Sequence, residues 1–348
     1  MLKACYLPYT LHFKQPAGTS RGILLEKQTY FVKIWDTRHP ESYGLGECAL
    51  FRGLSADDVP DYEQKLQEIC TNIHLFSPEE IQGWSSIVFG IETALNDLHS
   101  GGIRQPFPSL FSQGKQAIEI NGLVWMGNKT EMLQRIEQKL QDGFHCIKLK
   151  IGAINFEEEL MLLQSIRSRF SRQEIELRVD ANGAFTPREA MFKLEQLARY
   201  DIHSIEQPIR QGQWQEMQNL CKQSPVPIAL DEELIGVTNT EEKIALLECI
   251  HPSYIILKPS LAGGFRGSRE WIELAQSRDI KWWITSALES NVGLNAIAQW
   301  TSTLQTDMPQ GLGTGQLYTN NIPSPLTQTG SKLQYDPRGE WDFSSLKW

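Results

Sequence analysis

Three acidic residues stand at points where a short apolar run stops, as the end of a buried strand would. They are Asp180, Glu206 and Asp231, which end the runs at 175–180, 202–206 and 227–231. Adjacent parallel strands lie about 4.8 Å apart, so we expect the three carboxylates to converge. Like charges that close raise one another's pKa unless a cation joins them. Because no histidine or cysteine accompanies them, these oxygen ligands favour Mg²⁺ over Zn²⁺.

Lysines flank these acids. Lys148 and Lys150 lie two apart in the run at 146–151, so their side chains share one face of a strand, and Lys258 ends the run at 254–258. A buried lysine near a bound cation holds its proton less tightly and can act as a base near neutral pH. The set predicts that a substrate carboxylate binds the cation, which stabilises an enediolate, while a lysine removes the α-proton.

A plainer interpretation exists for each residue alone. A single Asp or Glu is more commonly a loop cap or part of a surface ion pair, and a single lysine is commonly a surface charge. The position of the acids at consecutive strand ends is what favours a cation site, and it depends on the strand register.

The elements that would position these residues form a regular series. Short β-rich runs lie at 118–125, 146–151, 175–180, 202–206, 227–231, 254–258, 281–286 and 311–318, with amphipathic stretches such as 129–141 and 156–170 between them. The spacing of about 25 to 30 residues is that of a βα unit. Since no GxGxxG follows the first run, we predict a closed α/β barrel of the (β/α)8 type, with functional groups at the carboxyl ends of its strands. Lys258 would then face Lys148 and Lys150 across the barrel mouth.

The first hundred residues have another character. Residues 29–36 alternate as a half-buried strand does, residues 13–20 are rich in turn formers, and helical periodicity runs over 57–76 and 85–100. We predict an α+β domain over 1–112, the barrel over 113–322, and a turn-rich segment over 323–348 that packs back on the first domain.

Composition narrows the classes of partner. The 348 residues carry 33 Lys+Arg and 42 Asp+Glu, a net charge of −9, with no long basic run, which disfavours nucleic acid. No stretch of about 20 apolar residues and no secretory leader pattern is found, and the six cysteines form no CxxC pair. We expect a cytoplasmic protein with reduced thiols that acts on a small-molecule carboxylate, without a membrane partner. The sequence does not determine the oligomeric state, and a homo-oligomer is one of the alternatives.

Five segments in order resemble the enolase superfamily, in its muconate-lactonizing-enzyme subgroup. They are KLK at 148–150, RVDANGAF at 178–185, IEQP at 205–208, ALDE at 229–232 and LKPS at 257–260. The resemblance covers essentially the whole chain and implies a (β/α)7β barrel behind an N-terminal α+β capping domain. It further implies that Asp180, Glu206 and Asp231 bind Mg²⁺ and that Lys150 and Lys258 stand on opposite faces of the substrate.

The same resemblance implies supporting roles. Lys148 would help to hold the substrate carboxylate and tune Lys150. Arg178 would also be a substrate-binding residue, and with Asn182 it would lie around the metal and the lysine pair. The loop at 16–22 and the turn at 46–55 resemble capping loops that close over substrate and exclude water.

Within the subgroup, TSALESNVG at 285–293 and GLGTG at 311–315 are similar to segments of the o-succinylbenzoate synthase family. This resemblance implies a hydro-lyase of menaquinone biosynthesis, which removes water from 2-succinyl-6-hydroxy-2,4-cyclohexadiene-1-carboxylate by syn elimination. Lys150 would take the α-proton and return it to the departing hydroxyl, while Lys258 stays cationic and stabilises the enediolate. Ser286 and the backbone at 311–313 would contact the succinyl arm.

Other reactions use the same two lysines. N-succinylamino acid racemases and dipeptide epimerases transfer one proton between faces of a carbon, and muconate cycloisomerisation is a third alternative. Gly313-Thr314-Gly315 stands where the epimerases carry a D-x-D motif for the substrate ammonium, which disfavours a dipeptide substrate. The racemase alternative stays open. A non-catalytic binding protein would have no need of two opposed lysines beside three acids.

Overall fold

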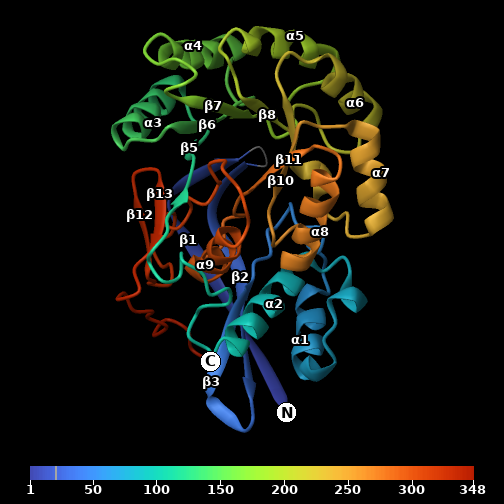
Figure 1. The fold of residues 1–348 in the computed structure, drawn as a ribbon, viewed down its shortest axis with the longest axis vertical. Helices are drawn as coiled ribbons and strands as arrows, with labels where there is room; N and C mark the ends of the chain where they lie inside the picture. Colours follow the sequence, from blue (N-terminus) through green and yellow to red (C-terminus); the bar gives the residue numbers. More distant parts are fainter. Residues whose placement is uncertain (20–21) are drawn as a thin grey trace.

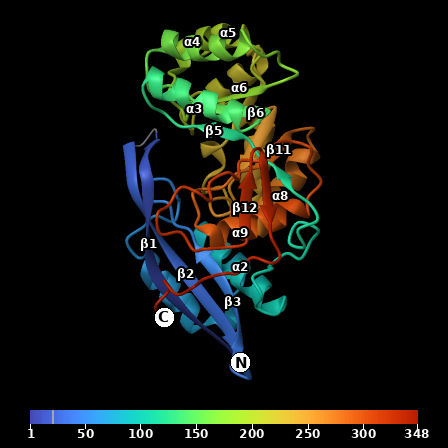
Figure 2. The same ribbon diagram turned by 90° about the vertical axis from the view of Figure 1, so that its left-hand side faces the viewer.

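A long antiparallel hairpin organises the N-terminal domain. The computed structural model describes residues 1–19 and 22–348, without the side chain of Thr19. Strands β1 (Leu2–Thr19) and β2 (Gly22–Asp36) pair along their length, and β3 (His39–Cys48) completes a three-stranded sheet. Figure 2 shows the hairpin extending from the N-terminal domain up beside the barrel.

The turn-forming residues at 13–20 do not form a loop over 13–19, which belong to β1, while Ser20 lies outside the described residues. The β1–β2 register shifts between His12 and Ala17, so the turn-forming residues are accommodated as an irregularity within a paired strand.

Two helices cover one face of this sheet. The predicted helix at 57–76 is shorter in the structure, where α1 spans Tyr62–Thr71, and α2 spans Ser85–His99. Gly44 and Gly46 of β3 allow α2 to approach, because a Cβ at either position would lie within 2 Å of a carbonyl oxygen of α2. Buried Val32, Ile34 and Ile91 belong to the apolar core of this domain.

The barrel confirms the predicted fold class. Seven parallel strands pair in chain order: β5 (Gly122–Val124), β6 (Cys146–Lys150), β7 (Glu176–Asp180), β8 (Ser204–Glu206), β9 (Ile228–Leu230), β10 (Tyr254–Leu257) and β11 (Lys281–Ile284). All seven are shorter than the runs from which they were predicted: β7 and β8 begin later than their runs, β6, β10 and β11 end earlier, and β5 and β9 do both.

The eighth predicted run forms no regular strand. Instead, residues Gln310 and Gly311 make isolated parallel bridges to Ile120 and Thr285, and so connect the first side of the sheet to β11. The glycine-rich sequence at 311–315 limits regular pairing, yet these two bridges still close the barrel.

Helices surround the barrel, as Figure 1 shows for the arc from α3 to α7. They are α3 (Lys129–Gln141), α4 (Phe156–Arg167), α5 (Pro187–Ala198), α6 (Trp214–Gln223), α7 (Thr240–Ile250), α8 (Gly264–Gln276) and α9 (Asn291–Ser302). The start of α3 follows from a capping box, in which the side chains of Asn128 and Glu131 bond to each other's backbone N–H. The strands and helices bury one extended apolar core between them.

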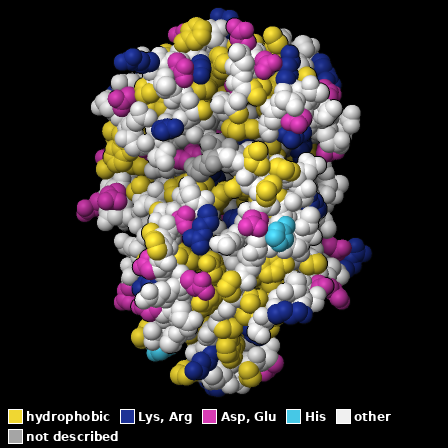
Figure 3. Space-filling view, turned by 180° about the vertical axis from the view of Figure 1, so that it is seen from behind, with side chains coloured by type: hydrophobic (Ala, Val, Ile, Leu, Met, Phe, Trp, Pro, Cys, Tyr) yellow, Lys and Arg dark blue, Asp and Glu magenta, His cyan; other side chains and the backbone are white. Residues whose placement is uncertain are grey.

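The C-terminal segment contains a short hairpin. Strands β12 (Leu326–Thr329) and β13 (Lys332–Tyr335) pair with each other, and β13 pairs with β4 (Ile118–Glu119). The last residues then reach the N-terminal sheet, where Leu346 is buried in a cluster with Phe31 and Leu45. No helix in the described ranges is long and apolar enough to cross a membrane, and Figure 3 shows acidic and basic side chains interspersed over one face.

Candidate active site

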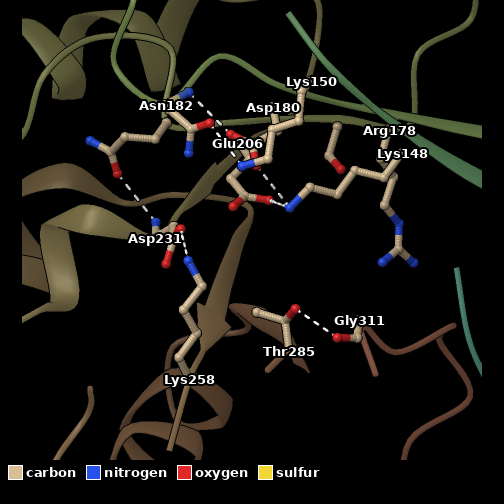
Figure 4. A network of polar contacts seen from close by, with 12 residues as sticks. Lys148, Lys150, Arg178, Asp180, Asn182, Glu206, Asp231, Lys258, Thr285 and Gly311 are labelled. Carbon is tan, nitrogen blue, oxygen red and sulfur yellow. Dashed lines mark hydrogen bonds and ion pairs between the residues drawn. The ribbon is translucent and has the colours of Figure 1, made fainter. Parts of the chain in front are cut away.

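Successive strands bring the predicted acids and lysines to one end of the barrel. Lys150 pairs in register with Asp180, and Asp180 pairs with Glu206, so these three stand at the same level of the sheet. Asp231 follows β9 and Lys258 follows β10. Figure 4 shows Lys258 approaching the acids from the side opposite to Lys148 and Lys150.

Each lysine is bound to an acid. Lys148 Nζ lies 2.9 Å from Asp180 Oδ2 and also bonds to Glu206. Lys150 Nζ lies 2.8 Å from the same Asp180 oxygen, and Lys258 bonds to Asp231. Because all three acids are almost completely buried, these ammonium groups supply the counter-charge that such carboxylates require.

Burial and charge act against each other on the pKa values. Burial alone would lower the pKa of Lys148 and of Lys258, but the neighbouring carboxylates outweigh it and raise both. Burial would raise the pKa of Asp180, yet Lys148 and Lys150 hold it well below its usual range. For Glu206, burial together with the nearby charge of Asp180 raises the pKa well above the ordinary value.

The acids have the chemistry of a divalent-cation site. Three buried carboxylates come from successive strands, and Glu206 Oε1 is buried without a hydrogen-bond partner, which leaves a donor atom for a cation. Among the described residues, no three His, Cys, Asp or Glu side chains are placed so that they could hold a metal ion without moving. The lysine ammonium groups bonded to these acids provide the compensation that a cation would otherwise supply.

Asn182 ties the acids to the lysines. Its Oδ1 accepts from Lys150 Nζ at 2.8 Å, and its Nδ2 donates to Glu232 Oε1 at 2.9 Å. The Asn182 backbone N–H donates to Asp180 Oδ1 at 3.0 Å. Its φ of 44° lies in the left-handed region, where asparagine is more readily accommodated than most residues.

A cavity of about 90 Å³ opens above this cluster. All three lysines, Asn182 and Ser286 line it, and Ser286 Oγ is hydrogen-bonded to Thr314 Oγ1 at 2.6 Å. The capping domain contributes Phe51 and Leu54 to the wall. This position of the turn at 46–55 matches what a capping loop would require, whereas Ser20 and Arg21 of the loop at 16–22 lie outside the described residues.

Arg178 lies below the cavity and is not among its lining residues. Its Nε donates to Glu176 Oε1 at 2.7 Å, its Nη1 donates to the Pro309 carbonyl at 2.9 Å, and its guanidinium lies 4.4 Å from the Trp283 ring centroid. Trp283 does line the cavity, so Arg178 supports the wall from underneath.

Several functional candidates were missed from the sequence. Glu232 lines the cavity and bonds to Asn182, although its place beside Asp231 in the ALDE segment could have drawn attention to it. Gln207 Oε1 accepts from the backbone N–H groups of Asp231 and Glu233, which orders the turn that carries the three acids at 231–233. The aromatic walls, Trp125 and Trp283, gave no signal beyond ordinary strand residues.

Comparisons with known proteins identify the family of the chain. Residues 131–332 match the family described as enolase C-terminal domain-like. The o-succinylbenzoate synthase of Desulfotalea psychrophila is 47% identical over 95% of this chain and 98% of its own length. The crystal structure of MenC from the same organism superposes with a TM-score of 0.84, at 43% identity, over 96% of this chain and 99% of that one.

A more distant solved structure shares the fold alone. The dipeptide epimerase of Enterococcus faecalis V583, crystallised with Mg and the dipeptide L-Leu-L-Tyr, has a TM-score of 0.79 at 18% identity, over 96% of this chain and 97% of that one. The fold and the matched segment show that the chain belongs to the enolase superfamily. Within that superfamily, its identity to the full-length relative places it in the o-succinylbenzoate synthase family.

Proposed function

We propose that this chain converts 2-succinyl-6-hydroxy-2,4-cyclohexadiene-1-carboxylate to o-succinylbenzoate with loss of water, a hydro-lyase reaction of menaquinone biosynthesis. The observation that carries the proposal is a pair of lysines, Lys150 and Lys258, on opposite sides of three buried acids, in a chain 47% identical to an o-succinylbenzoate synthase. A site of this kind places a base on one face of the substrate and a fixed cation on the other.

Lys150 is the proposed base. In its neutral form its Nζ takes the proton from the carbon that bears the carboxylate, and the ring electrons then expel the hydroxyl group. Lys150 returns that proton to the departing hydroxyl on the same face, so water leaves and the ring becomes aromatic. Asn182 orients Lys150 throughout through its hydrogen bond of 2.8 Å.

Lys258 is the proposed electrostatic partner. Burial would lower the pKa of Lys258, but the carboxylates of Asp231, Glu206 and Glu232 outweigh it and raise the pKa. The raised pKa favours the ammonium form. A fixed positive charge on the face opposite to the base stabilises the negative charge that develops on the substrate carboxylate. Lys258 therefore needs to keep its proton through the reaction.

Asp180, Glu206 and Asp231 are the proposed ligands of Mg²⁺. A bound Mg²⁺ would offset the charge of these acids and stabilise negative charge on the substrate carboxylate. Lys148, bonded to both Asp180 and Glu206, would hold that carboxylate and keep the acids in place. Arg178 acts from below by supporting Trp283, and Ser286 is available to the succinyl arm.

The test is an ultraviolet assay of diene loss with freshly prepared substrate and Mg²⁺. We expect rapid turnover by the unmodified protein and a loss of about 10² to 10⁴-fold in Lys150→Ala, which is the usual contribution of a general base. Arg188→Gln changes an exposed residue at the start of α5 and serves as the control. No turnover by a folded, Mg²⁺-supplied protein would refute the proposal.

N-succinylamino acid racemisation is the second candidate, because two lysines on opposite faces suit transfer of one proton from face to face. Deuterium exchange at the α-carbon of an N-succinylamino acid measures it directly. Exchange without diene turnover would move the assignment to a racemase. Turnover of both substrates would show that the two activities share one site.

A further inference from the structure

A second cavity of about 260 Å³ adjoins the active-site cavity and shares one wall with it. Trp125, which follows β5, lines both cavities. Among the described residues that line the second cavity, Lys14 and Arg135 are basic and none is acidic. We propose that this cavity is an anion subsite in which Arg135, assisted by Lys14, binds the terminal carboxylate of the succinyl arm. The inference rests on the proposed function, since it assigns the far end of that substrate.

Arg135 is held in place but keeps binding capacity. It lies on α3, and its Nη1 donates to the carbonyl oxygens of Trp125 at 3.0 Å and Met126 at 2.9 Å. Glu131, one turn earlier, accepts from the Asn128 backbone N–H in the capping box. A guanidinium has five N–H donors, and backbone carbonyls take only part of that capacity, so a carboxylate can still bind to it.

The active-site cavity itself offers no spare cation for a second carboxylate. Lys148 and Lys150 are bonded to Asp180, and Lys258 is bonded to Asp231. A carboxylate that leaves water without a partner loses favourable solvation, and the loss is larger for an ion than for a neutral polar group. The cations in the adjoining cavity would compensate that loss.

The barrel geometry directs the arm to this side. The acids and lysines stand on β6 to β10, whereas Ser286, Gly311 and Trp125 line the other half of the mouth, between β11 and β5. The same segment of chain continues from Gly311 to Gln316 and Leu317, which line the second cavity. An arm that passes Ser286 and Trp125 is therefore directed toward the second cavity, which Arg135 lines.

The hairpin forms the outer wall of this subsite. The Lys14 backbone N–H donates to the Leu317 carbonyl at 2.8 Å, and the Phe13 ring packs on Tyr318 at a centroid distance of 4.7 Å. These contacts hold Lys14 beside the chain segment that follows the barrel closure, so the capping domain and the barrel each supply one cation.

The test compares the natural substrate with an analogue whose succinyl arm ends in a neutral carboxamide. We expect Arg135→Gln to raise KM for the dicarboxylate about tenfold while kcat changes by less than about threefold, as for a charge-assisted bond far from the reacting atoms. The variant should also lose most of the preference for carboxylate over carboxamide. Arg135→Lys should restore part of both, and Arg188→Gln should behave as the unmodified protein.

The outcomes separate the two proposals. If the unmodified protein turns over the substrate and Arg135→Gln keeps its KM and its preference, the anion subsite is refuted and the proposed function stands. If the unmodified protein is inactive, the proposed function fails, and the subsite fails with it. Should Arg135→Gln not fold, because it loses its bonds to the backbone, Lys14→Gln provides the second variant. It should raise KM for the dicarboxylate and weaken the preference for carboxylate over carboxamide, and if it changes neither, the proposal is refuted.

Discussion

Glu92 joins the two domains in a way that makes stability depend on pH. It lies on α2 of the capping domain, and its Oε2 accepts from the Phe265 backbone N–H at 2.6 Å, in the first turn of the barrel helix α8. Burial raises the pKa of Glu92 to about 7 from an ordinary 4.5, even though backbone hydrogen bonds from Phe265 and Arg266 oppose that change. The nearby Arg266 side chain is paired with Glu79 and does not offset the effect.

The direction of the pH dependence of stability follows from the raised pKa of Glu92. Between about pH 4.5 and 7 the folded protein binds a proton at Glu92 that the unfolded chain has lost, so stability falls as the pH rises through this window. At about 1.4 kcal/mol for each pH unit, the ionised carboxyl costs at most about 3 kcal/mol above pH 7. Glu92→Gln keeps an acceptor for Phe265 but does not ionise. The variant should therefore match the unmodified protein near pH 5 and exceed its stability by up to about 3 kcal/mol at pH 8.

Urea unfolding of both proteins from pH 5 to 8.5 measures this difference. Because the other buried acids are common to both, their titration cancels in the comparison. Glu195→Gln, at an exposed position of α5, is the matched control and should give no pH-dependent difference. A difference between Glu92→Gln and the unmodified protein that stays constant across this range would refute the reasoning.

Three further predictions concern the junction, meaning the contacts between the N-terminal domain and the barrel, and the active site. Glu289→Gln removes the charge that accepts from Ser260 Oγ at 2.5 Å and from the Ala287 N–H at 2.7 Å, so kcat should fall about tenfold with a smaller change in KM, measured by steady-state kinetics. Glu47→Ala removes the bonds to Ser290 that link the N-terminal sheet to α9 and should lower the free energy of unfolding by about 3 kcal/mol in urea titration. Treatment with EDTA should abolish diene turnover, and added Mg²⁺ should restore it; turnover unaffected by EDTA would contradict the metal proposal.

The barrel and its charged residues could be predicted because local sequence carries both signals. Residues such as Asp180 and Lys258 end short apolar runs at a steady spacing, and the resulting strands bring them to one end of the barrel. The helix predicted at 129–141 matches α3, because Asn128 and Glu131 define its start.

The other features of the fold and the site depend on contacts between distant residues, which no local sequence pattern shows. Glu47 bonds to Ser290 across 243 positions of sequence, and Lys27 is buried beside Glu47 and Glu289 at the same junction. Pro16 suggested a loop, but pairing with β2 keeps β1 extended to Thr19. Arg178 was predicted to contact substrate, and only its bonds to Glu176 and Pro309 place it beneath the cavity instead.

The distribution of charge around the barrel mouth selects among substrates. The half formed by β6 to β10 carries the acids and lysines, whereas the half from β11 to β5 presents Ser286, Thr314 and Trp125, with no acidic residue among the described lining residues of that half. A dipeptide would bring an ammonium group that needs an acid there, and Thr314 offers only an uncharged hydroxyl. A succinyl arm instead brings a ketone and a carboxylate, for which hydroxyl groups and, further along, Arg135 are suitable partners. The same asymmetry therefore disfavours dipeptides and favours succinyl substrates, including N-succinylamino acids.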